Sequence, residues 1–125
     1  MKNILLDTNF IIYALSFKID LKQELDRITD FNYQISMLRA SIDELERLIN
    51  ESKLFEKRLI KLALKYIGQK DLNIIDKKGH VDDLLVEMDP KTTIIATQDK
   101  ALKKRLKEKG FKIITIRQKK HMRIE

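Results

Sequence analysis

Acidic residues follow two strongly apolar segments of this sequence, at the points where those segments end. Asp7 comes directly after Asn3–Leu6 (NILL), and Asp99 comes shortly after Thr92–Thr97 (TTIIAT). Short, continuously apolar runs of this kind predict buried strands. Ligand sites in open α/β sheets lie outside the carboxyl ends of the strands, where a side chain can face a cleft from a rigid backbone. We therefore expect Asp7 and Asp99 to lie at the same edge of one sheet.

Two predicted helix starts supply further acids. Segment 41–49 (SIDELERLI) carries an apolar stripe, which Glu44 and Glu46 flank while Asp43 points away from it. We expect one of the two flanking glutamates, and not Asp43, to reach a cleft beside the core. Asp82 and Asp83 lie side by side at the predicted start of another helix, which ends before the proline at position 90.

Carboxylates that converge without cysteine suit a hard divalent cation, Mg²⁺ or Mn²⁺, that keeps several water ligands. The chain has no cysteine and only two histidines, so thiol chemistry and a histidine-rich metal site are excluded. A bound ion can activate water and neutralise the charge that develops on a reacting phosphate. It also relieves the repulsion between neighbouring carboxylates. The acidic positions therefore predict metal-assisted hydrolysis.

Each acid also has a purely structural interpretation. Asp7 and Asp99 could cap the helices that follow them, and at least one of Asp82 and Asp83 could cap the short helix. Glu44 could complete a capping box with the serine at position 41. What favours the metal site is the occurrence of four acidic sites at the right element ends of one small α/β chain.

The elements that must position these residues alternate between strand and helix. The predicted strands are Asn3–Leu6, Tyr33–Leu38, Leu72–Ile75, Thr92–Thr97 and Phe111–Ile116, and the predicted helices are Phe10–Leu15, Leu21–Ile28, one opening at Ser41, Leu54–Ile67 before Gly68, one opening at Asp82 or Asp83, and Asp99–Glu108. This alternation predicts a three-layer α/β/α fold with a central parallel sheet of about five strands. The length of 125 residues predicts a single domain, 1–125, with a basic tail at about 117–125.

Positive charge is concentrated at the end of the chain. The net charge is +7, yet residues 100–125 hold eleven Lys and Arg against two Asp and Glu, while the preceding residues hold 15 against 17. This distribution indicates a polyanionic partner, although a solvated lysine-rich helix would have the same composition. We expect His80 in a loop and His121 on the surface. Because neither a leader nor a long apolar segment is evident, we expect a cytoplasmic protein without a membrane partner.

Four segments, LLDTNFII, ASIDELERL, KGHVDDLL and ATQDKALKKRL, resemble the signatures of PIN-domain ribonucleases over nearly the full length of the chain. The resemblance is closest to archaeal PIN proteins and to the PIN domain of the eukaryotic small-subunit rRNA-processing endonuclease. It is more distant to the VapC toxin nucleases, and the segment VDDLLVEM lacks the small residues that many of those toxins have. The resemblance implies a parallel sheet flanked by helices, dependence on Mg²⁺ or Mn²⁺, and hydrolysis of single-stranded RNA.

Matched by position, the resemblance assigns metal-binding and catalytic roles to four acids and supporting roles to two polar residues. The acids are Asp7, Glu44 in preference to Glu46, Asp82 with Asp83 as the alternative, and Asp99, and the supporting residues are Asn9 and Thr97. The helix after the fourth strand is expected to bind RNA phosphates through Lys103, Lys104, Arg105 and Lys107.

The expected function is therefore a metal-dependent endoribonuclease that acts in rRNA processing. The alternatives are a VapC-type toxin ribonuclease and a non-catalytic RNA-binding module. The corresponding partners are single-stranded RNA, a second copy of the chain in a homodimer, and an antitoxin or ribosome-assembly proteins. Helix Leu54–Ile67 could supply a partner surface, but its apolar stripe is by default expected in the core.

Overall fold

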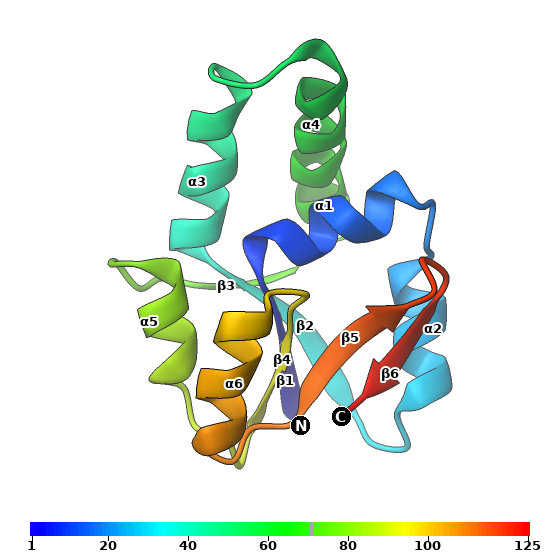
Figure 1. Cartoon of the computed structure of the whole chain (residues 1–125), viewed down its shortest axis with the longest axis vertical. Helices are drawn as coiled ribbons and strands as arrows, with labels where there is room; N and C mark the ends of the chain where they lie inside the picture. Colours follow the sequence, from blue (N-terminus) through cyan, green and yellow to red (C-terminus); the bar gives the residue numbers. More distant parts are fainter. Residues whose placement is uncertain (71) are drawn as a thin grey trace.

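A six-stranded sheet forms the centre of the computed structural model, which describes residues 1–70 and 72–125 (Figure 1). The strands are β1 (Lys2–Leu6), β2 (Tyr33–Leu38), β3 (Asn73–Ile75), β4 (Thr93–Ala96), β5 (Ile113–Arg117) and β6 (His121–Ile124), in the order β3-β2-β1-β4-β5-β6. Only the β5–β6 pair is antiparallel among these neighbours. The chain builds outward from β1 in one direction and then from β4 in the other. The strand order therefore reverses between β1 and β4.

Helices cover both faces of the sheet. They are α1 (Thr8–Ser16), α2 (Leu21–Ile28), α3 (Arg39–Ile49), α4 (Leu54–Gln69), α5 (Val81–Val86) and α6 (Lys100–Glu108). Side chains alternate across β1, so Ile4 and Leu6 join the core under α1 to α4, while Leu5 joins the core under α5 and α6. Strands buried on both faces need the continuous apolar runs that the sequence shows. The predicted α/β/α architecture is confirmed.

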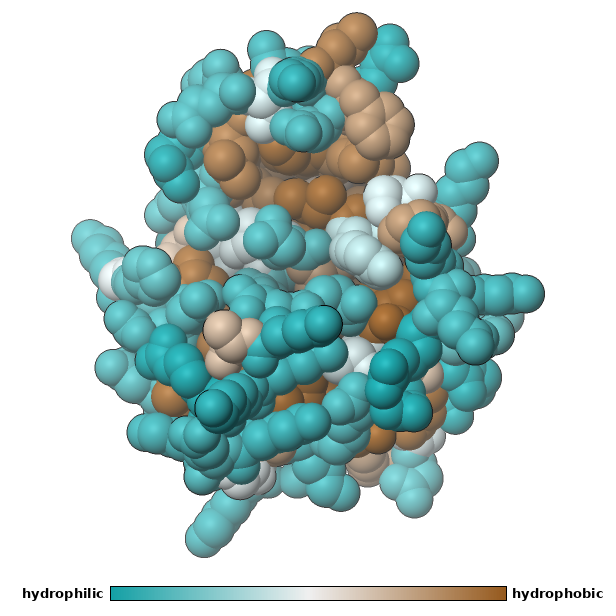
Figure 2. All heavy atoms as spheres, viewed as in Figure 1, coloured by the Kyte–Doolittle hydropathy of each residue, from teal (hydrophilic) through white to brown (hydrophobic). Residues whose placement is uncertain are grey.

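Helices α3 and α4 form an antiparallel pair that projects beyond the sheet (Figure 1). Helix α4 buries Ile60, Ala63 and Ile67, so its apolar stripe lies in the core as expected by default. It also carries the exposed apolar side chains Leu54, Phe55 and Leu62. Brown, hydrophobic side chains gather in the upper part of Figure 2, where α3 and α4 lie. None of the described helices has the length and apolar character needed to cross a membrane.

The end of the chain is a β-hairpin, where the sequence analysis expected only a basic tail. Three residues, Gln118 to Lys120, join β5 to β6, and the first two, Gln118 and Lys119, have positive φ values of 55° and 57°. This backbone is typical of a type I′ turn, whose twist suits a hairpin. Lys120 N–H donates to Arg117 O at 3.1 Å and closes the turn. The sheet consequently has one strand more than predicted.

Two helix starts differ from the prediction. Strand β2 passes directly into α3 at Arg39, so Ser41 lies inside the helix instead of at its N-cap. The predicted capping box is therefore wrong, and the Ser41 hydroxyl is buried with no hydrogen-bond partner in the described part of the chain. Helix α5 begins at Val81 with His80 at its N-cap, so Asp82 and Asp83 belong to its first turn and neither is the cap.

Several other predicted bounds shift by one or two residues, as α4 and β3 illustrate. Helix α4 continues past Gly68 to Gln69, where the sequence analysis ended it before the glycine. Glycine is common just after a helix because it adopts conformations that other residues avoid, but it can also take the helical conformation, as Gly68 does here. Strand β3 begins at Asn73, one residue later than predicted, and Leu72 is buried in the core ahead of it.

Candidate active site

A cavity of about 550 Å³ opens at the carboxyl ends of the strands, where the strand order reverses. It lies among the start of α1, the first turns of α3, the segment that joins β3 to α5, and the start of α6. Its lining consists of Asp7, Thr8, Asn9, Ala40, Asp43, Glu44, Arg47, Lys77, Lys78, Gly79, His80, Val81, Asp82 and Asp99. The four acids assigned by position, Asp7, Glu44, Asp82 and Asp99, all reach this one cavity.

Asp7 is the most deeply buried acid of the cavity, with 7% of its surface exposed. Its backbone N–H donates to Ala96 O at 2.9 Å and ties the end of β1 to β4. Its Oδ1 accepts a hydrogen bond of 2.8 Å from Thr8 N–H, and its Oδ2 accepts one of 2.8 Å from Thr97 Oγ1. Burial raises the pKa of Asp7, the two hydrogen bonds oppose that rise, and the charges of Asp82 and Asp99 add to it.

Thr97 contacts two of the acids that line the cavity, Asp7 and Asp99. It is fully buried at the end of β4, and its hydroxyl accepts a 3.2 Å hydrogen bond from Asp99 N–H while it donates to Asp7. Asp99 is the N-cap of α6, where its Oδ1 accepts from Leu102 N–H at 3.1 Å. Asp7 likewise occupies the N-cap of α1. Each aspartate therefore caps a helix and also lines the cavity, so the two interpretations do not exclude each other.

The side chains of Asp82 and Asp83 lie in different environments. Asp82 is half-buried and lines the cavity. Asp83 lies outside it, exposed, and accepts a hydrogen bond of 3.0 Å from Arg105 Nη2 of α6. The geometry favours Asp82 over Asp83 as the acid that faces a ligand in the cavity.

On α3 the sequence analysis was right about Glu44 and wrong about Asp43. Glu44 is half-buried and Asp43 exposed, and both line the cavity, whereas Glu46 does not. Asp43 was excluded because it points away from the apolar stripe. The cavity, however, extends around the solvent-facing side of the helix, where a residue needs no contact with the core to line it.

Several lining residues were missed from the sequence. Thr8 is 2% exposed, and its hydroxyl is buried without a hydrogen-bond partner among the residues that the structure describes. Arg47, Lys77 and Lys78 bring three positive charges to the cavity. The lysines follow β3 after one intervening residue, Asp76, so they could have been found only by extending the search beyond the first residue after each strand.

The basic residues of α6 lie outside the cavity. Arg105 is paired with Asp83, and Lys107 Nζ forms an ion pair of 3.1 Å with Glu125. Lys103 is half-buried, and burial lowers its pKa. Lys104 is exposed on the same helix. Only the N-terminal end of α6 reaches the cavity, through Asp99.

Comparisons with known proteins agree with this architecture. A family model described as a PIN like domain matches residues 4–119. The chain belongs to the PIN-like domain family. This PIN-like chain is 34% identical over 127 aligned positions to ribonuclease VapC4 of Methanocaldococcus jannaschii, with 99% of the chain and 97% of the relative covered. It also resembles the solved structure of the PIN domain endonuclease Utp24, with a TM-score of 0.81 at 26% identity, covering 98% of this chain and 90% of that one.

The cavity of this PIN-like domain is lined by both carboxylates and cationic side chains, which on α3 come from the same helix. Carboxylate and hydroxyl oxygens are the donors that hard divalent cations prefer. Among residues 1–70 and 72–125, no three acidic or histidine side chains approach closely enough to form a ready metal-binding cluster. A divalent cation in the cavity would offset the mutual repulsion of these carboxylates.

Proposed function

We propose that this chain is a metal-dependent endoribonuclease that hydrolyses single-stranded RNA at the acidic cavity. The observation that carries the proposal is the environment of Asp7. Its carboxylate is buried and accepts hydrogen bonds from Thr8 and Thr97, and the charges of Asp82 and Asp99 add to the rise in its pKa that burial causes. A protein gains nothing in stability from gathering carboxylates around a buried one. Such an arrangement is typical of a site that binds a cation and performs hydrolysis.

The metal ligands that we propose are Asp7, Asp82 and Asp99, with Glu44 completing the shell or orienting water. The donor set fits Mg²⁺ or Mn²⁺, because it consists of hard oxygens, and the lining residue Thr8 adds a hydroxyl that has no hydrogen-bond partner among the described residues. When bound, such an ion supplies an activated water and neutralises charge on the phosphate. Thr97 holds Asp7 in one orientation, and Asn9, exposed at the cavity, is positioned to bind substrate or water.

Cleavage of a circular single-stranded RNA tests this proposal, because only an endonuclease can open a circle. We expect linear product in the presence of Mn²⁺ or Mg²⁺, none in EDTA, and none with the Asp7→Asn variant. Retention of Mn²⁺-dependent cleavage in a clean preparation of Asp7→Asn would refute the site. RNA binding without metal-stimulated cleavage by the unaltered protein would instead indicate a non-catalytic RNA-binding module.

For the cellular role we propose rRNA processing, which is supported by the likeness to the PIN domain endonuclease Utp24 over nearly the whole chain. A VapC-type toxin is the second candidate, favoured by the identity of 34% to ribonuclease VapC4. Two experiments in the protein's own host separate these roles. Accumulation of unprocessed rRNA precursor when the protein is depleted supports the first role. Toxicity when the protein is expressed, relieved by an adjacent small gene, supports the second. The homodimer, antitoxin and ribosome-assembly partners stay predictions.

A further inference from the structure

Three cations line the acidic cavity, and no ion-pair partner is seen for them among residues 1–70 and 72–125. Arg47 comes from α3, and Lys77 and Lys78 come from the segment between β3 and α5. Within the part of the chain that the structure describes, none of the three forms an ion pair, although Asp43 and Glu44 line the same cavity. The cations are therefore available to a ligand.

The segment that carries the two lysines has a defined backbone. Lys77 N–H donates to Ile75 O at 3.0 Å, which fixes the segment to the end of β3. Gly79 has a φ of 137°, a conformation that favours glycine, and lies against Leu84, whose side chain would be 3.5 Å from a Cβ at that position. Leu84 is itself buried in the core under α5 and α6. The two exposed lysines thus project from a segment that is anchored at both ends.

A phosphodiester chain needs such cations if it is to approach this cavity. The five carboxylates of the lining repel a polyanion, and a single divalent ion offsets only part of their charge. Lysine offers a phosphate a compact positive charge, and the guanidinium of arginine adds paired donors. Cations and carboxylates that face one cavity can hold a phosphate over the acids. By contrast, Arg105 and Lys107 of α6 are already paired with Asp83 and Glu125.

We propose that Lys77, Lys78 and Arg47 bind the phosphates of the RNA strand at the cavity, and that these residues, more than the lysines of α6, hold the strand in place for cleavage. The inference rests on the proposed function, because it names how the same site takes its substrate. It assigns the segment between β3 and α5 to substrate binding and moves the main RNA contact from the C-terminal quarter of the chain into the cavity.

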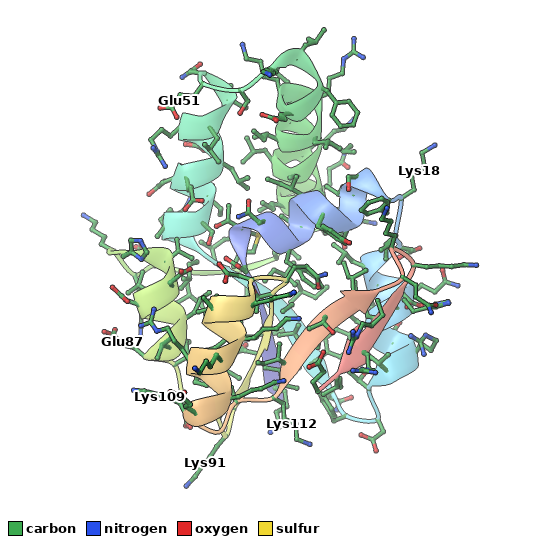
Figure 3. All side chains as sticks on the ribbon, in the orientation of Figure 1. Lys18, Glu51, Glu87, Lys91, Lys109 and Lys112 are labelled. Carbon is green, nitrogen blue, oxygen red and sulfur yellow. The ribbon has the colours of Figure 1, made fainter. Side chains whose placement is uncertain are left out.

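The test measures equilibrium binding of a fluorescent single-stranded oligouridine as a function of NaCl concentration, without added metal. The double variant Lys77→Ala/Lys78→Ala is compared with Lys61→Ala/Lys91→Ala, which removes the same charge from exposed residues outside the cavity. Figure 3 shows Lys91 at the opposite end of the molecule from α3. A third double variant, Lys103→Ala/Lys104→Ala, represents the binding surface on α6.

We expect Lys77→Ala/Lys78→Ala to weaken binding on the order of tenfold at about 0.1 M salt and to reduce the slope of log K against log salt by about 1.4, since each phosphate contact on a single strand contributes about 0.7. The variant Lys77→Arg/Lys78→Arg should restore both values, and Mn²⁺ binding followed by electron paramagnetic resonance should be retained in all variants, which checks that the acidic side chains stay in place. The inference is overturned if Lys77→Ala/Lys78→Ala binds like Lys61→Ala/Lys91→Ala, or if only Lys103→Ala/Lys104→Ala changes the slope.

The readout separates this inference from the proposed function. If the unaltered protein binds the oligouridine but does not cleave RNA with Mn²⁺, the proposed function fails, while the salt slopes still decide which cations bind phosphate. If it cleaves RNA and Lys77→Ala/Lys78→Ala raises KM with little change in kcat, both are supported. If cleavage occurs and the KM of that variant equals that of Lys61→Ala/Lys91→Ala, the inference alone is overturned.

Discussion

Thr97 Oγ1 donates a 2.8 Å hydrogen bond to Asp7 Oδ2 across 90 positions of sequence. The bond joins the ends of β1 and β4, the two strands between which the strand order reverses. Thr8 N–H holds the other oxygen of Asp7. With one donor on each oxygen, the carboxylate has a fixed orientation, and each oxygen keeps a lone pair for a ligand. The buried Asp7–Thr97 pair is thus the rigid part of a site whose other acids are more exposed.

Replacement of Thr97 by valine removes this hydrogen bond while nearly keeping the side-chain volume. We expect metal-dependent cleavage to fall about 10- to 100-fold, the range typical of groups that orient metal ligands. We also expect a loss of about 1–3 kcal/mol in the free energy of unfolding, because a buried carboxylate oxygen loses its donor. Cleavage rates and urea denaturation measure the two effects.

Thr97→Ser is the matched control, because serine keeps the hydroxyl that bonds Asp7 and accepts from Asp99. We expect it to retain most of the cleavage activity and to lose only the contribution of one buried methyl group, about 1 kcal/mol. Equal losses of activity in Thr97→Ser and Thr97→Val would show that the hydroxyl does not orient Asp7.

Asp7→Asn should separate activity from stability. Burial is the main cause of the raised pKa of Asp7, so the ionised carboxylate is unfavourable in the folded, metal-free protein. The neutral amide avoids that penalty, and its oxygen can still accept a hydrogen bond. We expect Tm in EDTA at pH 7 to be at least as high as that of the unaltered protein, while cleavage falls by more than about 100-fold. A clearly lower Tm in EDTA would mean that Asp7 is retained for folding.

The metal-free condition is the control within this experiment. Added Mn²⁺ should raise the Tm of the unaltered protein, because a ligand that binds only the folded state stabilises it. The same addition should leave the Tm of Asp7→Asn nearly unchanged. If both proteins respond equally to Mn²⁺, Asp7 is not a metal ligand.

The parts of the site that follow from strand ends could be predicted from sequence. The apolar run NILL predicted a buried strand that ends at Asp7, and the run TTIIAT predicted one that ends near Asp99. The pairing of Leu6 with Ala96 brings these two strand ends together. Helical periodicity left Glu44 and Glu46 as alternatives, and only the family resemblance favoured Glu44. Asp43 was lost to the same argument, because periodicity indicates only which side of a helix faces the core. It carries no information on where a cavity extends around the solvent side.

The C-terminal hairpin could not be predicted, because its turn has no sequence signal. A type I′ turn favours asparagine and glycine, and here Gln118 and Lys119 occupy the left-handed region instead. Glu125 helps to hold the hairpin. Its backbone exchanges two hydrogen bonds with Ile113, and its side chain accepts from Thr115 Oγ1 at 2.9 Å. Contacts of this kind outweigh a local turn preference, and they become visible only in the folded chain.

Asp82 and Asp83 are adjacent acids with different surroundings, and asparagine variants should separate them. Asp82→Asn should reduce cleavage by about 100-fold or more, because Asp82 lines the cavity with Asp7. Asp83→Asn removes only an exposed ion pair with Arg105 and should change the free energy of unfolding by less than about 1 kcal/mol. Each variant is the control for the other in a cleavage assay. Equal losses of activity would argue against Asp82 as the specific ligand.

Thr8→Val tests the one cavity hydroxyl that is buried without a partner among the described residues. An unsatisfied buried hydroxyl does not stabilise the fold, so we expect the free energy of unfolding to stay within about 1 kcal/mol of the original value or to rise. If the hydroxyl contacts a ligand or its water, cleavage should fall by about tenfold.

Thr93→Val is the control, because Thr93 is equally buried but lies at the opposite end of β4. It should leave cleavage unchanged. Unchanged cleavage in Thr8→Val as well would remove Thr8 from the site and leave its hydroxyl as a small defect in the packing.

Glu125 should give the stability of the fold a distinct pH dependence. Its hydrogen bonds from Lys107 and Thr115 are the largest causes that lower its pKa from 4.5 to about 2, and the charges of Lys103 and Lys107 lower it further. Because the folded pKa lies below the unfolded one, this contribution is fully present above about pH 5 and is lost as the pH falls toward 2.

Glu125→Gln should therefore be less stable than the unaltered protein at neutral pH, and the difference should shrink between pH 5 and pH 2. Glu108→Gln, which removes the charge of an exposed glutamate on α6, is the matched control for the loss of one charge. Urea denaturation across this pH range measures both, and a difference for Glu125→Gln that is constant with pH would mean that its charge does not hold the hairpin.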